Sequence, residues 1–426
     1  MLLFAPEQRF TCAACARCCR RATVPVTVRE AESYRKAGAE RWFRESDSES
    51  AVAFIDVFEP IPEHAPLLRI RSRSDGACGF LTPAGRCRIH EEMGVDRKPL
   101  SCRLFPFRLH PANSDVMVSA SFACPTVIAN EGATLASQKR DLQALQTAWQ
   151  RDFPEAGATV QLTDGHAPPR PAIPILRKVL CEILDRRSPD GGLDLRVNLR
   201  RIAALLEDLS RRRVGRLSPD RFLEYLDLVG GYAVRNEKPP KLRRPTRLAR
   251  LLFRGFLLTA LSVQTGLDPL LARRRTAHRA RLFRLAAHLH GLAPGTREFN
   301  FRRAVSVRIR LEDPELHAIV HRYLKTGFQT LGTGRRPIVD EVAMIAAHLN
   351  AACVFGGVHA LSAGKHTVDV ESFTQGLLAS SDLSHADAGG FLSSMLTTLS
   401  GGLEALYMFP PLMQCRPSNL PWMEQA

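Results

Sequence analysis

Hydrophobic residues recur at every third or fourth position along most of the chain beyond residue 170. This period places them on one face of a helix, whereas a half-buried strand would alternate apolar and polar positions. The predicted helices cover residues 176–184, 199–209, 219–230, 246–263, 269–290, 313–331, 338–355, 371–381 and 388–408. We expect the helix from 219 to end at Gly230-Gly231, and a short alternating run at 304–311 to form a strand. The larger part of the chain is therefore predicted to be mainly α-helical.

The first 130 residues show a shorter and less regular pattern. Runs rich in Val and Thr at 23–28 and 116–118 predict strands, and the spacing over 29–43 predicts a helix. Glycine and proline mark the turns between these segments. The fold class that follows is mainly α, with a small irregular α+β cysteine-rich domain before a large helical domain.

We place the two domains at residues 1–133 and 134–426. The second is expected to begin with a helix at 135–153, followed by a linker near 163–174 that is rich in proline and glycine. A chain of 426 residues is long enough for two hydrophobic cores. We find no internal repeat and no low-complexity tract.

The formal net charge is +16, and arginine pairs recur between residues 170 and 303. Two interpretations stay open. The arginines could be solvated helix faces and C-terminal turns, where cations suit the helix dipole. They could instead attract an acidic partner protein or an anionic surface. Few aromatic residues lie among them, and no helix-turn-helix, RNA-recognition or zinc-finger pattern is found, so nucleic acid is not the expected partner.

The chain shows no secretory signal, since its first apolar residues are too few for one. We also predict no transmembrane helix, because charges interrupt candidate spans, as Arg250 and Arg254 do within 248–263. These features predict a cytoplasmic protein. Thiols stay reduced there, so clustered cysteines indicate metal binding or redox chemistry rather than disulfides.

Eight of the eleven cysteines lie within the first 124 residues. The candidate metal ligands are Cys12, Cys15, Cys18, Cys19, Cys78, Cys87, Cys102 and Cys124. The first three are spaced by two residues, which lets one short loop wrap a metal, and small buried hydrophobes would not need this spacing. The sequence therefore predicts a metal or iron–sulfur site near the N-terminus.

The division of these thiols among sites stays open. The side chains of adjacent residues point apart, so we expect Cys18 and Cys19 not to share one ion. Cys124, which precedes a proline, could complete a set with the first three cysteines. Cys19 would then join the three cysteines between residues 78 and 102 at a second centre. The same eight cysteines also fit one four-iron, four-sulfur (4Fe–4S) cluster, with four thiols left unbound.

The run of three cysteines at two-residue spacing favours an iron–sulfur cluster over zinc. Zinc remains the alternative, because Cys12 with Cys15 and Cys87 with His90 have the two-residue spacing of zinc ligand pairs. We also expect Arg103, next to Cys102, either to donate a hydrogen bond to a metal-bound sulfur or to form a surface ion pair.

These motifs resemble a known family. The chain contains Cys12-x-x-Cys15-x-x-Cys18-Cys19, then Cys78-Gly79-Phe80-Leu81, Cys87-Arg88-Ile89-His90, and Pro99-Leu100-Ser101-Cys102-Arg103-Leu104-Phe105-Pro106. This series is similar to the CxxCxxCC cysteine-cluster family, described as zinc- or iron-chelating, which includes flagellin lysine N-methylase-like proteins. The resemblance covers about residues 8–130. It implies metal or cluster binding by the cysteines.

For the methylase branch, the resemblance also implies methyl transfer from S-adenosylmethionine to a protein lysine. No glycine-rich loop follows a predicted strand, so catalytic and cofactor-binding residues stay unknown. A shared module does not determine the chemistry. Two other functions therefore stay open: a non-enzymatic zinc or iron module joined to a basic partner-binding helical domain, and an iron–sulfur redox protein.

Overall fold

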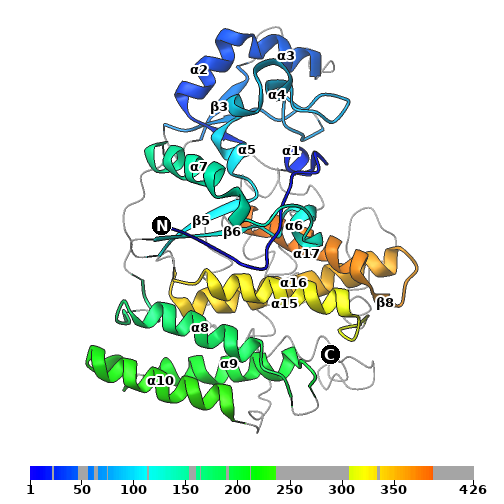
Figure 1. Cartoon of the computed structure of the whole chain (residues 1–426). Coiled ribbons are helices and arrows are strands. Elements are labelled where there is room, and N and C mark those ends of the chain that lie inside the picture. The colour runs from blue at the N-terminus through cyan, green and yellow to red at the C-terminus, as the bar shows by residue number, and fades with distance from the viewer. Residues whose placement is uncertain are drawn as a thin grey trace, which may run out of the picture. The chain divides into compact units, whose positions relative to one another are not determined.

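The computed structural model describes residues 1–21, 24–46, 56–61, 66–73, 75–112, 115–152, 160–163, 165–188, 191–211, 213–236, 307–332 and 336–386. The chain folds into two compact units (Figure 1). The first comprises Met1–His110 with Ser114–Ala156, and the second comprises Pro111–Asn113 with Gly157–Ala426. Helices dominate, and strands are concentrated in the first unit, so the predicted mainly α fold class is confirmed. The predicted domain limits, 1–133 and 134–426, stay a prediction.

The first unit contains two small three-stranded sheets. One has the order β1-β6-β5, with β1 (Leu2–Phe4) parallel to β6 (Asp115–Ala120), and β5 (Phe107–Ala112) on the other side of β6. The other has the order β2-β4-β3 and is antiparallel, with β2 (Pro25–Val26), β4 (Leu68–Ile70) and β3 (Phe58–Pro60). The strand predicted at 116–118 is present. The one predicted at 23–28 shortens to two residues.

The helices of the first unit are short. They are α1 (Arg17–Arg21), α2 (Val28–Ala37), α3 (Ala39–Ser46), α4 (Arg88–Met93), η2 (Val95–Arg97), α5 (Leu100–Leu104), α6 (Pro125–Ala129), η3 (Ala136–Gln138) and α7 (Lys139–Asp152). The single helix predicted over 29–43 is wrong. Gly38 ends α2 in the left-handed conformation (φ 100°) and donates its N–H back to Arg35 O. Glycine adopts this conformation without a steric penalty, so the chain turns there and starts α3.

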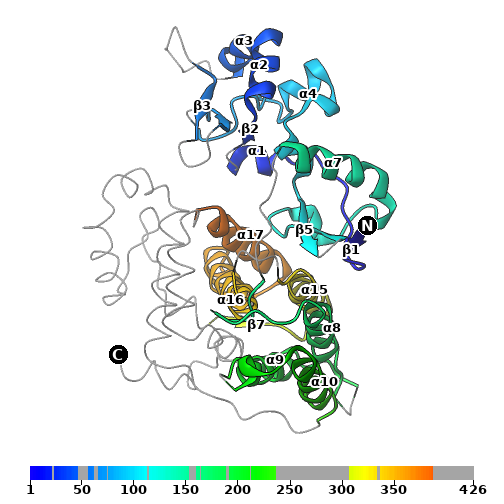
Figure 2. The ribbon, with the colours of Figure 1, turned by 90° about the vertical axis from the view of Figure 1, so that its left-hand side faces the viewer.

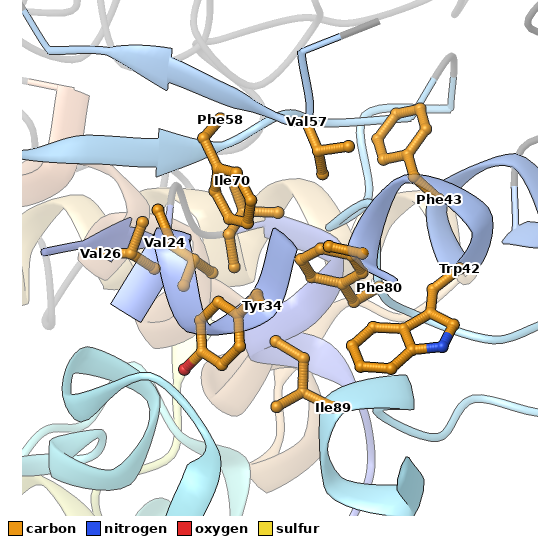
Figure 3. Packing of buried hydrophobic residues seen from close by; sticks show 12 residues of the cluster. Val24, Val26, Tyr34, Trp42, Phe43, Val57, Phe58, Ile70, Phe80 and Ile89 are labelled. Carbon is orange, nitrogen blue, oxygen red and sulfur yellow. The ribbon is translucent and has the colours of Figure 1, made fainter. Parts of the chain in front are cut away.

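An aromatic core lies within the first unit (Figure 3), and Cys78, Cys87 and Cys102 pack against it. Phe58 of β3 packs against Tyr34 of α2, and Phe80 packs edge-on against Trp42 of α3, both with ring centroids 6.2 Å apart. The cluster consists of Val24, Val26, Ala31, Tyr34, Ala39, Trp42, Phe43, Val57, Phe58, Ile70, Phe80 and Ile89. Each fully buried large side chain contributes about 1.5–3 kcal/mol to stability.

A second apolar cluster places α7 in the first unit. Leu142 of α7 is buried with Leu2, Val116 and Val118, and Leu145 packs against the same group. The helix predicted at 135–153 is thus present as η3 followed by α7, and it covers the β1-β6-β5 sheet.

The described part of the second unit is helical. Its elements are α8 (Ala172–Leu184), α9 (Leu195–Leu209), η4 (Val214–Arg216), α10 (Pro219–Arg235), β7 (Arg308–Ile309), α15 (Pro314–Gln329), α16 (Ile338–Ser362), β8 (Thr367–Val368) and α17 (Val370–Ala386). Most predicted helices are present, with shifted ends. Of the strand predicted at 304–311, the described residues 307–311 contain β7, which pairs in parallel with β8. The helices predicted at 246–263, 269–290 and 388–408 lie outside the described residues.

Helix α10 corrects one predicted boundary. It continues four residues beyond Gly230-Gly231 and ends at Arg235. A Cβ at Gly230 would lie 3.1 Å from both γ-carbons of Val179. This glycine therefore allows α10 to approach α8 closely and does not end the helix.

Helix α16 qualifies the prediction about membrane spans. Residues 342–362 contain no Asp, Glu, Lys or Arg, a stretch that the sequence prediction overlooked. Among the described helices, α16 alone is long and apolar enough to cross a membrane, but 72% of its most apolar window is buried inside the protein. Burial of this extent is what a core helix shows. The absence of a transmembrane segment stays a prediction.

Helices α16 and α17 lie side by side (Figure 2) and approach closely at glycines. A Cβ on Gly376 of α17 would lie 2.5 Å from Gly356 N of α16 and would also collide with Ala352 O. Both obstacles are backbone atoms, which cannot rotate away.

We therefore predict that Gly376→Ala destabilises the protein by about 1–3 kcal/mol, as overpacking in a core does. Thermal unfolding followed by circular dichroism measures this. The control is Gln375→Ala, an exposed neighbour on the same helix, which should change the melting temperature little. Equal melting temperatures for Gly376→Ala and wild type would contradict the packing described.

Candidate metal centre

The first cysteine motif spans a loop and a short helix. Cys12 and Cys15 are exposed in the segment that precedes α1, and Cys18 and Cys19 are half-buried within α1. Two alanines of the loop, Ala14 (φ 52°) and Ala16 (φ 57°), adopt the left-handed conformation. This conformation costs a non-glycine residue roughly 1–2 kcal/mol. The loop around Cys15 is therefore strained, as loops at functional sites often are.

A backbone hydrogen bond brings the second motif to the first. Cys78 N donates to Cys19 O over 2.6 Å. Cys78 also pairs with Ser72, and Leu81 pairs with Cys87, in two isolated antiparallel bridges. The tight turn between Leu81 and Cys87 is closed by Thr82 N donating to Arg86 O. Cys87, the residue before α4, is thereby returned to the neighbourhood of Cys78.

Helix α5 supplies Cys102. Cys78, Cys87 and Cys102 are all partly buried against the aromatic core of the first unit. The structure therefore gathers five thiols from segments up to 84 residues apart, namely Cys18, Cys19, Cys78, Cys87 and Cys102, which we call the five-thiol cluster. Each of the five thiols influences the ionisation of at least one other.

The expectation that Cys18 and Cys19 point apart is wrong. Their Sγ atoms are 4.0 Å apart. The reason is that α1 is helical, so consecutive side chains are rotated by about 100° rather than the 180° of a strand. For Zn–S bonds of about 2.3 Å, two thiolates on a tetrahedral zinc lie about 3.8 Å apart. The pair is therefore spaced much as two ligands of one ion.

The ionisation of the cluster reflects this crowding. The S–H···S contact lowers the pKa of Cys18 to about 6 and raises the pKa of Cys19. Burial raises the pKa of Cys78 to about 11 and also raises the pKa of Cys102, and neighbouring thiols add to both increases. Burial and neighbouring thiols therefore favour the protonated form of Cys19, Cys78 and Cys102.

Cys124 lies near Cys15. Cys124 is buried at the start of α6, and its pKa is raised by burial and, to a smaller degree, by the nearby Cys15. Cys12 is exposed. The sequence-based division placed Cys19, Cys78, Cys87 and Cys102 at one centre and Cys124 with the first motif at another, and it stays a prediction. The structure departs from it in placing the Cys18 sulfur beside that of Cys19.

The donor set of the cluster fits a zinc or iron centre. All its ligand atoms are sulfur, which selects zinc or iron–sulfur over magnesium or calcium. Arg103 Nε is buried without a hydrogen-bond partner, next to Cys102, and a metal-bound thiolate would accept from such a donor. Within the described residues, no three His, Cys, Asp or Glu side chains lie close enough to hold one ion as they stand. The sulfurs would thus have to draw together on binding. His90 is exposed on α4.

Residues 11–125 match the model of the CxxCxxCC family, whose description is "Putative zinc- or iron-chelating domain". The predicted family resemblance is confirmed for these residues, and the match indicates zinc or iron chelation as the function of this region. The flagellin N-methylase-like aspect stays a prediction. No curated protein and no solved structure matches the chain.

Sequence reasoning missed the residues that hold α5 in place, above all Glu30. Thr27 and Glu30 form a capping box at the start of α2. A Thr followed three residues later by Glu is a signature of a helix N-terminus and was present in the sequence. It does not reveal that the same carboxylate also contacts α5, because that contact joins residues 70 positions apart.

The strained loop yields a prediction. Ala14→Gly and Ala16→Gly should each leave the melting temperature unchanged or raise it by a few degrees, because glycine adopts positive φ without the alanine penalty. Differential scanning calorimetry of the metal-free protein tests this.

The control is Ala31→Gly in the interior of α2, where the same change removes buried atoms and lowers helix propensity, so it should destabilise by about 1 kcal/mol or more. Destabilisation of the loop variants as large as that of the control would contradict the left-handed geometry.

Proposed function

We propose that the protein is a metal-binding protein whose first unit chelates zinc or iron through cysteine thiolates. The observation that carries this proposal is the five-thiol cluster, which brings together Cys18, Cys19, Cys78, Cys87 and Cys102 from four chain segments. Three of these thiols, Cys78, Cys87 and Cys102, pack against one apolar core. Hydrophobic packing alone would not require five sulfurs at one place.

The thiols, Lys98 and the aromatic core would each contribute to metal binding in a different way. The thiols would lose their protons to become ligands, and a bound cation supplies the charge that makes several adjacent thiolates stable together. Lys98 assists, since its charge contributes to the lowered pKa of Cys18 and opposes the rise in the pKa of Cys102. The aromatic core beneath excludes water from one side, which strengthens each electrostatic interaction.

We propose the exposed Cys12 and Cys15, with Cys124, as further ligands, either of the same centre or of a second one. Of the two metals, we propose iron first, as a 4Fe–4S cluster. The support is the run Cys12-x-x-Cys15-x-x-Cys18, which is typical of cluster-binding loops. Zinc is the alternative, supported by the spacing of the Cys18–Cys19 pair.

Anaerobic purification followed by metal and acid-labile sulfide analysis tests the proposal. We expect stoichiometric iron or zinc in wild type and a large loss in Cys78→Ser and Cys102→Ser. Cys181→Ser, in α8 of the second unit, is the matched control and should keep the metal. Visible absorption with sulfide identifies a cluster, and zinc without colour identifies a zinc site. A wild-type protein that remains metal-free after reconstitution with either metal would overturn the proposal.

We further propose that the protein transfers a methyl group from S-adenosylmethionine to a lysine of a partner protein in the cytoplasm. The support is the resemblance to flagellin lysine N-methylase-like proteins. The net charge of +16 adds to it, since it favours an acidic protein partner. If this proposal fails, a non-enzymatic metal module or a redox protein accounts for the metal centre.

Donor binding distinguishes these functions. S-adenosylmethionine should raise the melting temperature of the metal-loaded protein, because a ligand at 100 times its dissociation constant stabilises the folded state by about 2.7 kcal/mol. Adenosine serves as the control and should have little effect. No shift at saturating donor would remove the methyltransferase reading, and a reversible visible redox change would then support electron transfer.

A further inference from the structure

We infer that Glu30 is a positioning residue of the metal centre, because its one carboxylate ties the helix that carries Cys102 to the start of α2. The inference rests on the metal-binding function proposed above. It assigns no ligand role to Glu30, which acts through the backbone of α5.

The two oxygens of the carboxylate serve two helices. Oε2 accepts hydrogen bonds from Thr27 N (2.8 Å) and Thr27 Oγ1 (3.1 Å), while Thr27 Oγ1 accepts from Glu30 N (3.2 Å). These contacts complete the capping box of α2. Oε1 accepts from Leu100 N over 2.8 Å, and Leu100 is the first residue of α5. Glu30 therefore satisfies backbone donors at the N-termini of both helices.

Helix α5 needs this external support. It has only five residues, and isolated helices of that length are unstable in water. Pro99, the residue before it, provides no side-chain cap, so the first N–H groups of α5 lack partners within the helix. The bond from Leu100 N to Glu30 is a charge-assisted one, which is about twice as strong as a neutral hydrogen bond.

Two more contacts join the same pair of segments. Ser101 Oγ donates to Pro25 O over 2.7 Å, and Tyr34 OH donates to Arg97 O over 2.8 Å. With the Glu30 bond, these hold residues 97–101 against residues 25–34. Cys102 follows directly, so the position of its sulfur is set by α2 and not by α5 alone.

The ionisation of Tyr34 agrees with this arrangement. Burial raises its pKa, and the charges of Glu30 and of the Cys102 and Cys87 thiols raise it further. Glu30, Cys87 and Cys102 therefore all lie near Tyr34. Partners that orient metal ligands in this way commonly contribute 10- to 100-fold to metal affinity.

The experiment uses the full-length protein with Co²⁺ as the probe, since Co²⁺ bound by thiolates gives an intense sulfur-to-metal absorption band. Affinity is measured by competition with a chromophoric chelator. We expect Glu30→Ala to weaken Co²⁺ binding by about 10- to 100-fold and to reduce the absorption per bound cobalt, because Cys102 is no longer held in place. Glu30→Gln, whose amide oxygen still accepts from Leu100 N, should recover part of both.

Thr27→Ala is the matched control. It removes the Thr27 hydroxyl from the α2 cap and leaves the contacts of the Glu30 carboxylate with Thr27 N and Leu100 N, so it should lower the melting temperature without changing the affinity or the spectrum. Equal affinities of wild type and Glu30→Ala, or equal losses in Glu30→Ala and Thr27→Ala, would overturn the inference alone. A wild-type protein that binds neither cobalt nor zinc nor iron would overturn the proposed function as well.

Discussion

The packing of Tyr34, Trp42, Phe58 and Phe80 into one buried cluster is the interaction on which the candidate metal centre depends. These side chains come from α2, α3, β3 and the turn after Cys78, and no single one of these segments is long enough to be stable alone. Because Cys78, Cys87 and Cys102 pack against this cluster, fixing these segments relative to one another also fixes the positions of the three thiols. Removing this core would disperse the cysteines even though every one of them remained.

The same burial that assembles the thiols opposes their ionisation. Desolvation is the main cause of the raised pKa of both Cys78 and Cys102, and each thiolate disfavours its neighbours. A bound cation would offset both the desolvation of the thiolates and the repulsion between them. Metal binding and the folding of the first unit are therefore energetically coupled. The hydrogen bond from Leu100 N to Glu30 supports the same assembly, because it holds the segment that bears Cys102 on this core.

The second unit is organised by a different constraint, the close approach of helix backbones. Gly376 lies against Gly356 at the contact of α17 with α16, and Gly230 lies against Val179 at the contact of α10 with α8. Glycines at these positions reduce the distance between helices and increase the buried area. In the proposed function, the positive charge of the second unit, and not its core, attracts the acidic partner protein.

The sequence by itself determined the local chemistry and most helices of the described chain. The spacing of Cys12, Cys15 and Cys18 is visible to any reader of the chain, and so is the apolar period of α8 and α9, because both are properties of residues within one or two turns. Only the tertiary structure decided that Cys18 joins Cys19 in one cluster with three distant thiols, that Gly230 packs inside a helix, and that Glu30 serves two helices. These features depend on contacts between residues far apart in the chain, and local propensity carries no information about them.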